Sequence, residues 1–134
     1  MRINKPVFKY IEYELYNYDE IKKELTWYRE AILEGTPYVE VSGNSQPSDS
    51  TASKVMRLTS TSFVIQSERV INAVDKSLSI LGDKHRELFE WKYQKGLPWQ
   101  EVALEMGISD RTYFRLRREL VITVGQQLGV INIE

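Results

Sequence analysis

Apolar side chains recur at helical spacing in the first 35 residues of the chain. Between Pro6 and Gly35 there is neither proline nor glycine, and these two residues suit the first turn and the end of a helix. The apolar positions on one face are Val7, Ile11, Tyr18, Ile21, Leu25, Tyr28 and Ile32. From Tyr18 onward the steps alternate between three and four residues, which is typical of a heptad seam. The pattern predicts a long amphipathic N-terminal helix, either continuous or with a break near Asn17.

A polar segment separates this helix from the next periodic one. Residues 36–53 are rich in Ser, Thr, Pro, Gly and Asn, so little apolar surface offsets the entropy of ordering them, and we interpret them as a flexible linker. Helical spacing returns in residues 54–81, at Val64, Ile71, Val74, Leu78 and Leu81. The apolar face of the N-terminal helix needs a partner. A hairpin with the 54–81 helix, a homodimer seam and contact with another protein are the open alternatives.

Glycines divide the rest of the chain into short helices. Gly82 ends the 54–81 helix, and Asp83 is predicted to be the N-cap of the next helix, 84–95. The core side of that helix is predicted to be Leu88, Phe89 and Tyr93. The fold class is therefore all-α. We expect an N-terminal region for assembly or interaction (1–35), the linker (36–53) and a C-terminal domain (54–134).

The segment GLPWQEVALEMGISDRTYFRLRREL, residues 96–120, has the residue types that two helices meeting at a tight turn require. Pro98 suits the first turn of a helix through Met106, Gly107 suits the left-handed turn, and Ser109 can cap the second helix. Ala103 supplies the small residue that the first helix needs where the second crosses it. The apolar residues that would pin both helices to a shared core are Val102, Met106, Ile108, Tyr113 and Leu116. This spacing predicts a helix-turn-helix whose second helix covers residues 109–120.

The second helix has an apolar face and a basic face. Its apolar face carries Tyr113, Leu116 and Leu120, and at about 100° per residue the opposite stripe carries Arg111, Phe114, Arg115 and Arg118. Residues 109–118 hold four arginines against one aspartate, although the whole chain has a formal net charge of −1. Because arginine can donate two hydrogen bonds to guanine, the stripe predicts a helix that enters the major groove of double-stranded DNA. Phe114 is left open between a thymine methyl contact and packing on a neighbouring helix.

Other polar residues flank this stripe. At the N-terminal end of the helix, Ser109 and Asp110 are predicted to reach base edges or phosphates, with stabilisation of the helix dipole as the alternative for the aspartate. Thr112 and Arg117 lie toward the sides of the helix, where phosphates pass. Gln100, in the first turn of the preceding helix, is also predicted to reach a phosphate.

The composition limits other chemistry. The chain has no cysteine and a single histidine, His85, which we expect on the surface at a helix N-terminus. This excludes disulfides, thiolate metal sites and a metal site built from histidines. No nucleophile–base arrangement or phosphate-binding glycine loop occurs, so we predict no enzyme activity, cofactor or metal. Without a signal peptide or a membrane-length apolar run, we expect a cytoplasmic protein with no membrane partner.

Several of these motifs resemble a known family. They are Tyr93 with Gly96, the stretches WQEVA (99–103) and GIS (107–109), and RTYFR (111–115). Together with the tyrosine-rich N-terminal helix, they are similar to phage transcriptional regulators of the RinA/ArpU type, which look like region 4 of bacterial sigma factors. The resemblance implies a phage or prophage activator of late genes that binds promoter or operator DNA with host RNA polymerase as a partner. The alternative is a phage small terminase subunit, which is disfavoured because those proteins usually place the DNA-binding unit first.

Overall fold

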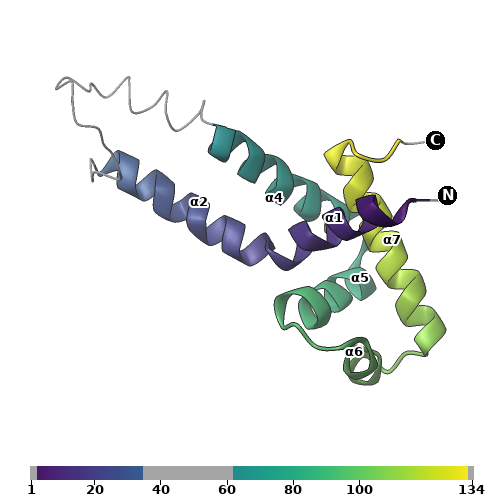
Figure 1. Ribbon diagram of the computed structural model, residues 1–134. Coiled ribbons are helices and arrows are strands. Elements are labelled where there is room, and N and C mark those ends of the chain that lie inside the picture. Colours follow the sequence, from purple (N-terminus) through teal and green to yellow (C-terminus); the bar gives the residue numbers. More distant parts are fainter. Residues whose placement is uncertain (1–2, 35–61, 133–134) are drawn as a thin grey trace. The chain divides into compact units, whose positions relative to one another are not determined.

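The computed structural model describes residues 3–34 and 62–132, and within these ranges the chain is all-α, as predicted, with no strand (Figure 1). The elements in chain order are α1 (Lys5–Tyr16), α2 (Tyr18–Leu33), α4 (Ser62–Leu81), α5 (Asp83–Leu88), the π-helical segment η1 (Phe89–Gln94), α6 (Trp99–Met106) and α7 (Asp110–Leu128). They belong to two compact units, one formed by residues 1–19 with 70–134 and the other by residues 20–69.

This division differs from the domain organisation that the sequence suggests. Helix α1 belongs to the same unit as the C-terminal helices, whereas we expected residues 1–35 to form a region of their own. The expected linker, residues 36–53, lies outside the described residues. That residues 1–35 serve assembly and residues 54–134 bind DNA stays a prediction.

The N-terminal helix is divided at Asn17, one of the two predicted alternatives. Asn4 begins α1, because its Oδ1 accepts a hydrogen bond from the backbone N–H of Val7 at 3.1 Å. At the other end, the Asn17 side-chain amide donates to the carbonyl of Tyr13 at 2.7 Å, which satisfies one of the carbonyls that a helix end leaves unpaired. Helix α2 then begins at the next residue.

In the unit of residues 20–69, α2 and α4 share apolar and polar contacts. The rings of Tyr28 and Phe63 meet edge to face with their centroids 5.2 Å apart, and Arg29 forms an ion pair with Glu68. Buried apolar residues of this unit are Leu25, Ile32 and Val64. These contacts are the ones that the hairpin alternative requires, and the homodimer seam stays a prediction.

The segment expected as one helix over residues 84–95 has two parts. Helix α5 covers Asp83–Leu88, and the backbone then widens into η1. The prediction that Asp83 caps this helix was wrong. Gly82, with φ of 108°, holds the capping position, and the carboxylate of Asp83 pairs with Arg86 at 2.7 Å. Leu88, Phe89 and Tyr93 are buried as predicted.

In the unit of residues 1–19 and 70–134, helix α7 contacts α1, α5 and α6 (Figure 1). Its buried side chains are Tyr113, Leu116, Leu120, Val121, Val124 and Leu128. At Gly125 there is no room for a side chain, since a Cβ atom there would lie 2.7 Å from Cδ1 of Ile11 in α1 and still closer to Cδ1 of Ile131, in the segment that follows α7. The glycine therefore allows α1 to pack directly against α7.

Candidate nucleic-acid interface

The predicted tight turn joins α6 to α7 through residues 107–109. Gly107 adopts the left-handed conformation, with φ of 66° and ψ of 38°. The backbone N–H of Ile108 donates to the carbonyl of Ala103 at 3.0 Å, which closes the end of α6. Ser109 then caps α7, because its hydroxyl oxygen accepts from the N–H of Thr112 at 3.1 Å. Hydrogen bonds at both ends of the turn thus set the direction in which α7 leaves α6.

Apolar residues of both helices are buried where they were predicted to be. Val102, Ala103 and Met106 of α6 are buried, as are Tyr113 and Leu116 of α7, whereas Ile108 is half-buried. With the apolar face of α7 packed inward, the orientation of its other side is determined, since residues three and four positions apart share a face.

The outward side of α7 carries the predicted basic stripe. Arg111, Arg115 and Arg118 are exposed, which confirms their predicted orientation. Ser109 and Asp110 at the start of the helix are exposed too. Gln100 is exposed in the first turn of α6, and Thr112 is half-buried.

Phe114 packs against the neighbouring helix. Its ring lies 5.1 Å from that of Trp99 in α6 and 4.9 Å from that of Tyr113, centroid to centroid. Of the two possibilities that the sequence left open, packing is the one observed. The residue nevertheless keeps 42% of its surface exposed, and a contact with a thymine methyl stays a prediction.

Arg117 makes a two-pronged ion pair with α1. Its Nε donates to Oε2 of Glu12 at 2.9 Å and its Nη2 to Oε1 at 2.8 Å, while Phe8 lies under the guanidinium, 4.9 Å from it. The side chain of Arg117 is only 29% exposed and that of Glu12 only 13%. Sequence reasoning missed this pair because its members are 105 residues apart. The phosphate contact predicted for Arg117 would rely on the Nη1 group, which is not bonded to Glu12.

A wider polar network surrounds this ion pair. The Tyr93 hydroxyl of η1 donates to Glu12 at 2.5 Å, and Nζ of Lys92 donates to the hydroxyl of Tyr16 at 3.0 Å. Burial would raise the pKa of Glu12, but the hydrogen bonds from Arg117 and Tyr93 and the nearby charges outweigh it and lower this pKa from 4.5. Burial next to the carboxylate raises the pKa of Tyr93. The network ties α1 and η1 to the predicted recognition helix.

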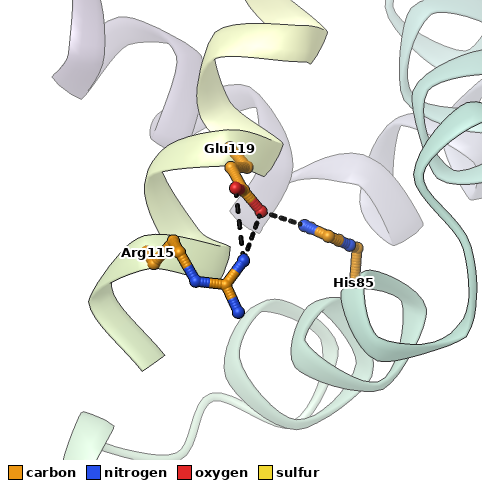
Figure 2. A network of polar contacts seen from close by, with 3 residues as sticks. All are labelled: His85, Arg115 and Glu119. Atoms are coloured by element: carbon orange, nitrogen blue, oxygen red, sulfur yellow. Dashed lines mark hydrogen bonds and ion pairs between the residues drawn. The ribbon is translucent and has the colours of Figure 1, made fainter. Parts of the chain in front are cut away.

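His85 is buried against α7, and the prediction that it lies on the surface was wrong. Only 8% of the residue is exposed, because α5 packs on α7 at this point. Its Nε2 lies 2.9 Å from Oε1 of Glu119, and both carboxylate oxygens of Glu119 lie 3.3 Å from Nη1 of Arg115 (Figure 2). A buried ring on one helix is thus linked through a carboxylate to an arginine of the exposed stripe.

The described residues, 3–34 and 62–132, contain no group of three or more His, Cys, Asp or Glu side chains placed to hold a metal ion. None of their helices combines the length and apolar character needed to cross a membrane.

The structure thus defines an all-α protein with a basic, solvent-exposed helix face beside a tight turn. The chain belongs to the family described as "Protein of unknown function (DUF722)", which matches residues 16–126. It is also similar to the "Transcriptional activator rinA" of Staphylococcus phage phi11, with 25% identity over 126 residues that cover 89% of this chain and 88% of the relative. No solved structure matches the chain.

Proposed function

We propose that the protein is a sequence-specific DNA-binding transcriptional activator of a phage or prophage, with residues 109–120 as the recognition helix in the major groove. The observation that carries the proposal is the row of exposed guanidinium groups at Arg111, Arg115 and Arg118 on the face of α7 opposite its buried side. The similarity to a protein named as a phage transcriptional activator supports the same function.

The charge of the whole chain does not oppose DNA binding. Its formal net charge is −1, but attraction to phosphates depends on the local potential at the contact. Three exposed arginines on one helix face create a positive potential there. The remainder of the chain is net acidic and adds no non-specific attraction to phosphates, which favours discrimination between sequences over general affinity.

We assign separate roles to the residues around the stripe. Arg111 and Arg115 are proposed to read base edges, because a guanidinium matches the paired acceptors of guanine in the major groove. The exposed residues Ser109, Asp110, Gln100 and Arg118, with Thr112 and Phe114 beside them, are proposed to complete the interface through phosphate or base contacts. Arg117 is proposed chiefly to hold α7 to α1, since two of its donor groups bind Glu12.

The target genes and partners belong to the same proposal. The resemblance of the motifs to the RinA/ArpU type supports activation of late genes together with host RNA polymerase, in the cytoplasm of the bacterial host. A homodimer would place two recognition helices on a symmetric operator. No step of this function requires catalysis or a cofactor.

Selection of bound duplexes from a random DNA pool tests the proposal with the full chain. We expect one motif to be enriched. On that motif Arg111→Ala and Arg115→Ala should each weaken binding by about 5- to 150-fold, the equivalent of about 1–3 kcal/mol, with a smaller loss on random DNA. Lys76→Ala, which removes an exposed charge from α4, is the control and should keep the preference.

Two outcomes would contradict this assignment. The first is a pool that shows no enrichment. The second is an equal loss on the selected and the random duplex for both arginine variants, because it would mean that neither residue reads bases. The mass of the protein in solution separates the activator from the small terminase alternative, since a closed ring of many copies would favour the terminase.

A further inference from the structure

Arg115 is oriented by a carboxylate of its own helix. Its Nη1 lies 3.3 Å from both oxygens of Glu119, one turn further along α7 (Figure 2). This contact occupies one corner of the guanidinium. The opposite edge, formed by Nε and Nη2, makes no hydrogen bond to another described residue and belongs to a side chain that is 59% exposed. That edge presents two parallel N–H donors, the arrangement that a pair of acceptors on a guanine base requires.

The carboxylate of Glu119 is itself held by a residue of a second helix, α5. Oε1 of its carboxylate lies 2.9 Å from Nε2 of His85, whose side chain is only 10% exposed. A carboxylate can only accept a hydrogen bond, so Nε2 is the donor here. An exposed pair of charges four residues apart on a helix is weak and mobile when it stands alone. With a buried ring fixing the carboxylate from a second helix, the arginine is restricted as well.

We propose that Glu119, backed by His85, is a positioning residue that directs Arg115 toward a base and thereby sets the sequence discrimination of the protein. This inference rests on the proposed function. Restriction of a long side chain before binding reduces the ordering cost of the correct contact. A carboxylate beside the interface also repels phosphates, so it lowers the affinity for every DNA sequence. Glu119 therefore favours specificity over general affinity.

The two contributions predict opposite effects of one substitution. In the full chain, Glu119→Ala should raise the affinity for a random duplex by about two- to fivefold, because a negative charge near the phosphates is removed. The ratio of affinities for the selected and the random duplex should fall by about two- to tenfold, because Arg115 is no longer oriented. A purely structural role would instead lower binding to both duplexes by the same factor.

Three further variants separate this mechanism from a general loss of structure. His85→Phe keeps a buried ring but removes the hydrogen bond, and it should lower the ratio without raising the affinity for random DNA. In an Arg115→Ala background, Glu119→Ala should leave the ratio unchanged, because the residue through which it acts is absent. Asp83→Asn removes a charge from the start of α5 and should not alter the ratio.

Each result decides the matter. An unchanged ratio in Glu119→Ala, or an equal reduction of the ratio whether or not Arg115 is present, would overturn the inference. If Glu119→Ala does not fold, as judged by its circular dichroism, Glu119→Gln and His85→Phe test the same ratio. If the wild-type protein shows no preference for any duplex, the proposed function itself is refuted. If the wild type shows a preference and Glu119→Ala keeps it, only the role assigned to Glu119 is refuted.

Discussion

Replacing Glu12 by glutamine would remove the charge that Arg117 faces while keeping the size of the side chain. Both side chains are largely buried, and they are joined by two hydrogen bonds of 2.8 and 2.9 Å. A glutamine can still accept one of these bonds through its single oxygen. The other bond and the charge attraction are lost, and the guanidinium stays between α1 and α7 without a counter-charge.

The expected loss follows from the partial exposure of Arg117. Removal of one partner from a fully buried ion pair costs about 3–5 kcal/mol, and a hydrogen bond to a charged group contributes about 1.5–3 kcal/mol. Because 29% of the Arg117 side chain is exposed, water can replace part of the interaction. We therefore expect Glu12→Gln to lower the free energy of unfolding by about 2 kcal/mol, which corresponds to a fall in Tm of roughly 6–10 °C.

Urea unfolding of the full chain, followed by circular dichroism, measures this loss. Arg117→Met should cost at least as much, because Glu12 is the more buried partner and keeps its charge. The double variant, Glu12→Gln with Arg117→Met, should lose about as much unfolding free energy as either single variant. This corresponds to a coupling energy of about 2 kcal/mol between the two residues. Asp83→Asn, which breaks the exposed pair with Arg86, is the control and should leave the urea midpoint nearly unchanged. Additive losses in the double variant would refute the reasoning.

Two further predictions concern pH and the turn. The pKa of Glu12 is lowered in the folded protein, so its contribution to stability is complete above the ordinary pKa of 4.5 and is lost as the pH falls through the lowered value. The difference in unfolding free energy between the wild type and Glu12→Gln should therefore be constant from pH 5 to 7 and should narrow below pH 4.5. A difference that widens in acid would contradict this prediction. Gly107→Ala should lower the free energy of unfolding by about 1–2 kcal/mol, because an L-residue with positive φ is strained although a Cβ there would meet no atom within 4 Å. Gly107→Asn should lose less, since asparagine tolerates this conformation better, and equal urea midpoints for wild type and Gly107→Ala would show that the turn does not require glycine.

The helices and the orientation of α7 could be predicted because their causes are local. Gly107 and Ser109 mark the turn through backbone conformation and a capping hydrogen bond, which depend on residues only a few positions away. The burial of Tyr113 and Leu116 and the exposure of Arg111 follow from the helical period alone. The break at Asn17 could be named only as an alternative, since the heptad spacing on both sides is compatible with a continuous helix.

What the sequence by itself determined is therefore an all-α chain with a basic face on its last helix. Only the tertiary structure decided which arginines of that helix are bound by carboxylates. Arg117 is bound to Glu12, 105 residues away, and Arg115 shares Glu119 with a histidine 34 residues from that glutamate along the chain. Helical periodicity assigns a residue to a side of its helix, but the partner on that side depends on how distant segments pack. For the same physical reason His85, expected in solvent, is buried where α5 meets α7.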